Sequence, residues 1–250
     1  CIDFSVFKTP LDLWERKPGP IRIGWHGGDN HYHDICSISE PLKAYVNGHD
    51  VKLVLYGAYY RGPLKGIDPN KVEEASWISV DAFPYKLATL GIDVAVIPLM
   101  DPAEPHMGFN HYKSDIKFLE YSALRVPSLA AAGRAAYASC QDGVNSLTYA
   151  TDDEFTAKLD YLCRDADLRK RLASSAYDWV REYRDLDKRI GMWAQAYQDA
   201  ADNPRRSDVV AAAESVPDED LRPAASNAQP EGGADPDPAG HQRLRLVKEG

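Results

Sequence analysis

Two lysines, a serine and a glutamate lie close together in the middle of the chain. Lys113, Ser114, Lys117 and Glu120 fall within the stretch KSDIKFLE, where a helix is predicted to begin at 114. A helix start presents unpaired backbone N–H groups and a partial positive charge, and both suit a phosphate group. Ser114 can cap this helix and donate to a phosphate oxygen, and Lys117 lies about one turn further on the same side. The group therefore indicates a phosphate site.

The same residues also fit a simpler interpretation. Glu120 follows Lys117 by three residues, so it can pair with that lysine or accept from a sugar hydroxyl. In the simpler case the helix is a solvated one, with an ion pair on its surface and Ser114 as an ordinary N-cap. Spacing alone supports the two interpretations equally.

A second candidate is the loop WHGGDNHYHD, residues 25–34. Gly27 and Gly28 allow the backbone to approach a ligand closely, as a phosphate-binding turn requires. The pattern is neither G-x-G-x-x-G nor a Walker motif, so it specifies neither a dinucleotide nor a triphosphate. His26 is expected to make a polar contact at the end of a strand.

The other histidines of this loop raise the question of a metal site. His31 and His33, with Asp29 and Asp34 nearby, are compatible with zinc binding, but no cysteine or fourth fixed ligand accompanies them. We therefore predict no metal, and we expect His31 and His33 to lie on the loop surface.

Strands and helices alternate along the chain and must position these loops. Strands are predicted at 21–27, 49–57, 75–80, 92–99, 126–131 and 147–150, and helices at 34–47, 84–91, 114–124, 152–163 and 166–199, the last with a break near 181–187. This order is typical of βαβ units in an α/β, doubly wound parallel sheet. Ligands of such sheets bind beyond the carboxyl ends of the strands, where the loops after Gly28, Gly57 and 99 are expected.

Composition narrows the classes of function. A formal net charge of -9 over 250 residues argues against a general nucleic-acid binder, although it allows a local basic pocket. The cysteines at 1, 36, 140 and 163 form no C-x-x-C, which indicates free thiols. The apolar run 93–100 is too short to cross a bilayer and no leader opens the chain, so we expect no transmembrane segment and a cytoplasmic protein.

Three regions are predicted. Residues 1–20 have scattered apolar residues and prolines and are expected to be a connector, and 21–200 form the α/β domain. Residues 201–250 are rich in Pro, Gly, Ala and acid and poor in large apolar residues. Such a segment buries too little surface to offset its ordering entropy, so a disordered tail is expected.

Two segments resemble a known family. The run DVAVIPLMDPAEPHMGFNHYKSDIKFLEYSALRVPSLAA (93–131), followed by DGVNSLTYATDDEFTAKLDYLCRDADLRKRLASSAYDWV (142–180), is similar to the C-terminal half of GT-B glycosyltransferases of the family-four, or group 1, type. The strands IRIGWHGG and VKLVLYG are similar to the beginning of the same domain. The resemblance covers roughly residues 15–200 and is most specific over 92–150. It implies a Rossmann-like fold.

In that family this half binds the nucleotide of a sugar nucleotide, and the resemblance implies roles here. His26, Gly27, Gly28 and Gly57 would belong to the donor site with Ser114 and Glu120, and Glu120 would hold the ribose hydroxyls. Lys113 and Lys117 would act on the phosphates as the catalytic groups, and the segment 77–81 would face the base. The donor is a substrate, so no cofactor is expected, and lysines in place of a cation imply a metal-independent hexosyltransferase.

The chain also departs from the family pattern. Where many members have a first glutamate eight residues before Glu120, this chain has Tyr112, which puts sugar recognition in doubt. The arginine common after the glycine loop is absent. GT-B enzymes have a second domain that binds the acceptor, and it would precede residue 1, so the chain is expected to be a fragment or to use a partner half. The isolated chain need not be active.

Three functions remain open from the sequence. The first is transfer of a sugar from a nucleotide-diphosphate sugar to an unknown acceptor. The second is a non-catalytic nucleotide-binding module, favoured by Tyr112 and the missing domain. The third is an unrelated flavodoxin-like interaction domain, which would bind no nucleotide.

Overall fold

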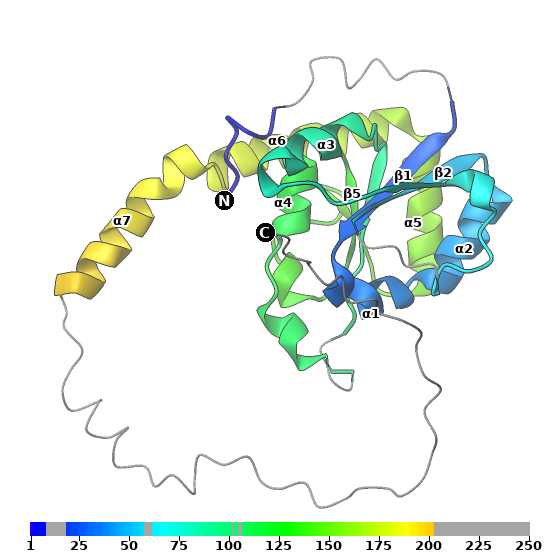
Figure 1. The fold of residues 1–250 in the computed structure, drawn as a ribbon, viewed down its shortest axis with the longest axis horizontal. Helices are drawn as coiled ribbons and strands as arrows, with labels where there is room; N and C mark the ends of the chain where they lie inside the picture. The colour runs from blue at the N-terminus through cyan, green and yellow to red at the C-terminus, as the bar shows by residue number, and fades with distance from the viewer. Residues whose placement is uncertain (9–18, 58–61, 102, 105–106, 203–250) are drawn as a thin grey trace, which may run out of the picture. The chain divides into compact units, whose positions relative to one another are not determined.

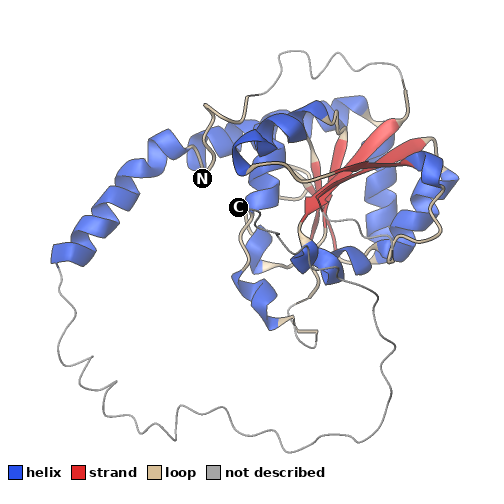
Figure 2. Cartoon of the chain, viewed as in Figure 1, coloured by secondary structure: helices blue, strands red, loops and turns tan. Residues whose placement is uncertain are grey.

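The protein is described by a computed structural model that covers residues 1–8, 19–57, 62–101, 103–104 and 107–202. Residues 1–197 form one compact unit, and 198–202 are the end of its last helix. Six parallel strands form one sheet in the order β3-β2-β1-β4-β5-β6 (Figure 1, Figure 2). The strands are β1 (Ile21–Gly27), β2 (Val51–Gly57), β3 (Val72–Ala75), β4 (Val94–Ile97), β5 (Ser128–Ala131) and β6 (Leu147–Tyr149).

Helices connect the strands and cover both faces of the sheet. They are α1 (Tyr32–Cys36), α2 (Ser39–Gly48), α3 (Phe83–Thr89), α4 (Ile116–Ala123), α5 (Asp152–Arg164), α6 (Ala166–Tyr183) and α7 (Leu186–Asp202). In Figure 1, α2 and α5 cover one face and α3 and α4 the other, with α6 packed against α4. The predicted α/β, doubly wound, Rossmann-like class is confirmed.

The strand order reverses between β1 and β4. The chain first builds outward from β1 through β2 to β3, then returns to build β4, β5 and β6 on the other side. The connections leaving β1 and β4 therefore depart in opposite directions and open a crevice beyond the two carboxyl ends, where ligands of such folds bind. β1 and β2 pair in register along their whole length, so Gly27 and Gly57 end side by side.

The core has the composition that a sheet covered on both faces requires. β1, β2, β4 and β5 are buried along most of their length, as in parallel sheets in general. Large side chains fill the layers between sheet and helices, and Trp25, Tyr56, Tyr121, Phe118 and Phe155 are fully buried among them. Each such side chain contributes about 1.5–3 kcal/mol by leaving water.

Local signals set most helix ends. Thr151 caps α5 by accepting from the Glu154 N–H, and Asp165 caps α6 by accepting from the Leu168 N–H; both residue types are favoured at this position. The predicted break in the last helical stretch is also present, because α6 ends at Tyr183 and α7 begins at Leu186.

Three predicted elements differ from the structure. The strand expected at 75–80 is wrong: β3 ends at Ala75, and the apolar residues that follow form a loop in which Trp77 packs on Tyr56 and Phe83. The helix expected at 34–47 is two helices, with a break at 37–38. The helix expected from 114 begins at Ile116.

Residues 1–8, which belong to the predicted connector, pack against the helices at the end of the unit. The Ile2 N–H donates to the Arg184 carbonyl at 2.8 Å, and the Leu186 N–H donates back to the Ile2 carbonyl at 2.9 Å. The ring of Phe4 packs edge-on against Tyr177. This segment therefore bridges the junction between α6 and α7.

The remaining expectations meet the structure only in part. Residues 9–18 of the connector and 203–250 of the tail lie outside the described residues. All four cysteines are free thiols. Among the helices in the described ranges, none combines the length and the apolar character needed to cross a bilayer.

Candidate functional site

Charged side chains from three segments meet beyond the carboxyl ends of β1 and β4. The turn after β1 leads into α1, the chain between β4 and α4 runs alongside, and α4 begins next to both. Lys117 and Glu120 come from α4, and Lys113 comes from the segment before it. His26 lies at the end of β1, His31 ends the turn that follows, and Asp34 lies in α1. The structure thus brings the two predicted loops together.

Asp34 is the centre of this cluster. Its side chain is 2% exposed, and its Oδ2 accepts from His31 Nδ1 at 2.7 Å and from Lys113 Nζ at 2.8 Å. Its Oδ1 accepts from the Met100 N–H at 3.0 Å and from Asn110 Nδ2 at 3.3 Å. Burial alone would raise the pKa of Asp34, but the hydrogen bonds from His31, Lys113 and Met100 together outweigh it and lower that pKa to about 2. Asp34 is therefore a carboxylate that fixes Lys113 and the chain after β4.

Lys117 has a different environment. Its side chain is 6% exposed, and its Nζ lies 2.8 Å from His31 Nε2. Among the described residues no carboxylate lies within 4 Å of this ammonium group. Burial lowers the pKa of Lys117 to about 8, against the opposing fields of Asp34 and Glu120. Within the described ranges, Lys117 is therefore a buried cation whose direct side-chain partner is an imidazole.

His26 and Glu120 form a second pair beside the lysines. His26 Nε2 lies 2.8 Å from Glu120 Oε2, and the imidazole packs against Phe83 and Tyr121. Burial lowers the pKa of His26, although the Glu120 carboxylate opposes that shift. The prediction that His26 makes a polar contact at a strand end is confirmed. Of the two possibilities that the sequence left open for Glu120, the ion pair with Lys117 is not among the described contacts: Glu120 contacts His26, and Lys117 contacts His31.

The glycines of this region are explained by packing as well as by ligand access. A Cβ on Gly27 would lie 2.5 Å from the Trp25 ring, and a Cβ on Gly57 would lie 2.5 Å from the Gly27 carbonyl oxygen. Gly57 also has φ +110°, which disfavours any other residue. At Gly28 the nearest atom is 3.4 Å away, so that position has room. The Trp25 ring of the same strand therefore requires a glycine at 27, and the close approach of β1 to β2 requires one at 57.

Ser114 does not have its predicted local role. Asp115, not Ser114, is at the N-cap position of α4, and Ser114 lies one residue earlier with an exposed side chain. The Asp115 side chain does not cap the helix, because its Oδ2 accepts from Ser139 Oγ at 2.7 Å and from Arg184 Nη2 at 2.8 Å. Contact of Ser114 with a phosphate stays a prediction.

The structure also gives His31 a role that the sequence did not predict, and it adds Asn110. His31 was expected on the loop surface, and this is wrong: it lies between Asp34 and Lys117 and is only partly exposed. Asn110 is buried and binds Asp34 and the Met100 carbonyl. His33 is exposed as expected. Asp34 follows His31 by three residues, but Lys117 is 86 residues away, so spacing could not predict the contact between that lysine and the histidine.

The prediction of no metal and the assignment of the base site remain predictions. Over the part of the chain that the structure describes, no three His, Cys, Asp or Glu side chains gather closely enough to hold a metal ion. Trp77 is 47% exposed and lies beside Gly57 at the carboxyl end of β2, where the base would be expected. Tyr112 is 84% exposed.

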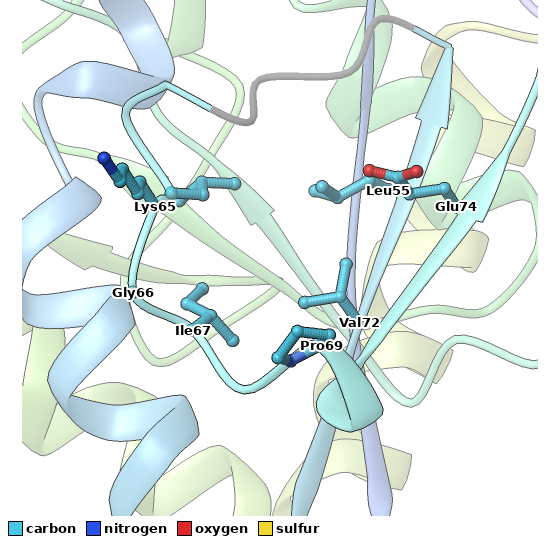
Figure 3. Close-up of a pocket in the computed structure, with 8 residues that line it drawn as sticks. Leu55, Lys65, Gly66, Ile67, Pro69, Val72 and Glu74 are labelled. Atoms are coloured by element: carbon cyan, nitrogen blue, oxygen red, sulfur yellow. The ribbon is translucent and has the colours of Figure 1, made fainter.

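Two hollows lie away from the charged cluster. One, of about 400 Å³, is beside β3 at the outer edge of the sheet, lined by apolar residues such as Leu55, Ile67 and Val72 (Figure 3). Lys65 and Glu74 lie on opposite sides of it. The other, of about 910 Å³, is lined by Ser139, Trp179, Trp193 and neighbouring residues of α6 and α7. Neither contains the predicted site residues, so volume does not identify the site.

Comparisons with known proteins place the fold. No protein-family model and no curated protein matches the sequence. Among solved structures, the C-terminal domain of a glycosyl transferase group 1 family protein, LpcC from Francisella tularensis, is similar with a TM-score of 0.57 and 18% identity, over 74% of this chain and 100% of that one. Anabaena Alr3699/HepE, in complex with UDP and glucose, has a TM-score of 0.60 and 15% identity over 79% and 55%. Sucrose-phosphate synthase from Thermosynechococcus elongatus has a TM-score of 0.59 and 13% identity, over 79% of this chain and 50% of that one.

These similarities confirm the predicted resemblance at the level of the fold. The chain has the architecture of the C-terminal half of GT-B glycosyltransferases. It spans the whole of the LpcC domain but about half of the HepE and synthase chains.

Proposed function

We propose that this chain binds a nucleotide-diphosphate sugar at the β1–β4 crevice and is the donor-binding half of a glycosyltransferase. The observation that carries the proposal is Lys117, a buried ammonium group whose direct partner is neutral rather than acidic. A cation buried without a counter-ion is costly to the fold, which favours a role in binding an anion. Lys113 lies in the segment just before the same helix, where its Nζ contacts Asp34.

The similar structures are consistent with this ligand. Alr3699/HepE has been solved in complex with UDP-glucose, and its fold matches this chain with a TM-score of 0.60. In this chain the carboxyl ends of β1 and β4 bring Gly28, Lys117 and Glu120 to one edge of the sheet. We place the diphosphate over Lys113, Ser114, Lys117 and the amides of the glycine loop, with Glu120 toward the ribose.

The chemistry follows from charge that develops as the glycosidic bond breaks. The bond between the anomeric carbon and the diphosphate oxygen gives its electron pair to that oxygen, so the leaving diphosphate gains negative charge. Ammonium and hydroxyl groups already in position stabilise this charge more in the transition state than in the ground state. The lysines thereby take the place of a divalent cation, and we propose a metal-independent reaction. The acceptor would come with a second domain.

The two lysines should contribute unequally. Lys113 is already neutralised by Asp34, so an incoming diphosphate must compete with that carboxylate. Lys117 has no carboxylate to give up within the described part of the chain. Calorimetry with UDP and GDP should show affinity at least about 30-fold weaker for Lys117→Ala and about 10-fold weaker for Lys113→Ala, in line with about 1.5–3 kcal/mol for charged hydrogen bonds.

Lys170→Ala provides the matched control, because this lysine is exposed on α6. It should bind nucleotide like the wild type. Wild-type affinity in both Lys113→Ala and Lys117→Ala would remove the proposal. The chain that carries its acceptor domain should then lose sugar transfer in the same order.

A non-catalytic nucleotide-binding module is the second candidate, favoured by Tyr112 at the position of the family's first glutamate. Tyr112 is highly exposed and brings no carboxylate to the donor sugar. Binding of UDP or GDP without release of sugar from any UDP-sugar or GDP-sugar, in a chain that includes the second domain, would identify the module.

A further inference from the structure

His31 contacts charged groups on both sides of its ring, and the proposed phosphate contacts do not use it. It ends the short turn Asp29–His31 that follows the glycine loop, and its backbone N–H donates to the Gly28 carbonyl at 3.0 Å. Its two ring nitrogens point in opposite directions, to Asp34 and to Lys117. The ring therefore connects an anion on one helix to a cation on another.

The partners of His31 determine which ring nitrogen has the proton. Asp34 is a carboxylate at neutral pH and can only accept hydrogen bonds. His31 Nδ1, at 2.7 Å from its Oδ2, must therefore be the donor. In the neutral ring Nε2 then has a free lone pair, and at 2.8 Å it accepts from the Lys117 ammonium.

A protonated His31 does not fit the same geometry. Its Nε2 would then have a hydrogen of its own, and it would face the ammonium hydrogens of Lys117 across 2.8 Å. Burial lowers the pKa of His31, and Lys117 and Lys113 lower it further, although the hydrogen bond to Asp34 opposes these effects. The charged groups that face the ring are Asp34 from α1, Lys113 from the segment before α4, and Lys117 from α4.

We propose that His31 is a positioning residue for the phosphate site: the neutral ring, with its proton on Nδ1, holds the Lys117 ammonium at the crevice so that an entering diphosphate receives a cation already in place. This rests on the proposed function for the identity of the ligand. Asp34 has two tasks in this arrangement, since it fixes Lys113 directly and Lys117 through the ring. In this arrangement the glycine turn contributes to phosphate binding in two ways: its amides contact the phosphates, and the His31 side chain positions Lys117.

Two substitutions separate the two ends of the ring. In His31→Gln the side-chain amide oxygen reaches the place of Nε2 and can still accept from Lys117, whereas the contact with Asp34 is lost. In His31→Asn the shorter amide N–H₂ reaches the place of Nδ1 and can still donate to Asp34, whereas Lys117 loses its acceptor. His33→Gln and His33→Asn are the matched controls, because His33 is exposed two residues further on.

Calorimetry with UDP at pH 7 tests the proposal. We expect affinity within about threefold of wild type for His31→Gln, at least about tenfold weaker for His31→Asn, and unchanged for both His33 variants. A merely structural role predicts comparable losses in the two His31 variants, and that result would overturn the proposal. Wild-type affinity in His31→Asn would overturn it as well.

Nitrogen-15 NMR of the ligand-free protein separates this proposal from the proposed function. The His31 ring should show a protonated Nδ1 and an unprotonated Nε2 at pH 7. The opposite tautomer or an imidazolium would overturn the positioning role, whatever the protein binds. If the wild type binds no nucleoside diphosphate, the proposed function fails, and the tautomer still decides whether His31 can hold Lys117.

Discussion

Asp34 and Asp115 are both buried carboxylates near the start of α4, and they have different partners and different roles. Asp34 is 2% exposed and receives Lys113 and His31, while Asp115, 6% exposed, receives Ser139 and Arg184. Asp115 ties the start of α4 to the α6–α7 junction. Asp34 ties the chain before α4 to the glycine turn.

The difference between the clusters is in how their cations are balanced. Arg184 has its carboxylate at 2.8 Å, and the ion pair is complete within the protein. Lys117 has an imidazole at the same distance and no carboxylate in direct contact among the described residues. An ion pair that is complete within the protein mainly stabilises the fold. A buried cation without a carboxylate partner instead indicates a site where an anionic ligand binds.

The largest effect is expected from removal of Asp115. Asp115→Ala leaves Arg184 without its carboxylate and Ser139 without its acceptor, so the free energy of unfolding should fall by about 2–4 kcal/mol. Urea denaturation measures this change. Asp178→Ala, on the exposed side of α6, should change it by less than about 0.5 kcal/mol. Equal changes in the free energy of unfolding for the two variants would show that the Asp115–Arg184 pair stabilises the fold no more than an exposed charge does.

Removal of the Lys117 charge should raise the free energy of unfolding instead of lowering it. Burial lowers the pKa of Lys117 from 10.5 to about 8, so the charged form destabilises the folded protein at pH 7. Lys117→Met keeps the volume and should raise the free energy of unfolding by about 1–3 kcal/mol at pH 7, at about 1.4 kcal/mol per pKa unit. The gain should fade as pH rises from 8 to 10.5. A loss of stability at pH 7, with Lys170→Met unchanged, would mean that the His31 contact outweighs the burial of charge.

Asp34 should make the protein sensitive to acid. Its pKa is about 2 in the folded protein against an ordinary 3.8, so its contribution of about 2 kcal/mol is present above pH 4. That contribution is lost as pH falls from 4 to 2. Asp34→Asn should flatten this part of the stability curve, measured as the urea midpoint against pH, relative to the wild type. An unchanged slope would show that other carboxyl groups determine the acid response.

The smallest effect is a pH dependence of nucleotide binding. Above pH 8 Lys117 loses its proton in the ligand-free protein, so the protein must take up a proton when a diphosphate binds. UDP affinity should therefore fall by up to about tenfold per pH unit above 8. In Lys117→Met the affinity should be weak at every pH and should not fall with this slope. Calorimetry in buffers of different ionisation enthalpy would detect the proton uptake directly.

The local parts of this fold were predictable from the sequence and the long-range parts were not. Strand β1 was predicted from its own residues, and the caps at Thr151 and Asp165 follow from residue types that favour the N-cap position. The false strand at 75–80 arose because its apolar residues resemble a buried strand, whereas Trp77 instead packs over the end of β2.

The site was divided in the same way. Lys113, Lys117 and Glu120 were proposed because they lie close together in sequence around the start of one predicted helix. Their partners could not be found by spacing, since His31 is 86 residues from Lys117 and Asp34 is 79 residues from Lys113. A histidine in a polar loop gives no sign in the sequence that two charged groups will close around it.

The contact of Ile2 with the α6–α7 junction determines how this unit would respond to mechanical force. Two backbone hydrogen bonds, to Arg184 and from Leu186, hold the first strand-like residues against the last helices. Tension applied through residue 1 would load these two bonds before it reached the sheet, so the junction would yield first under traction while the strands still held their register.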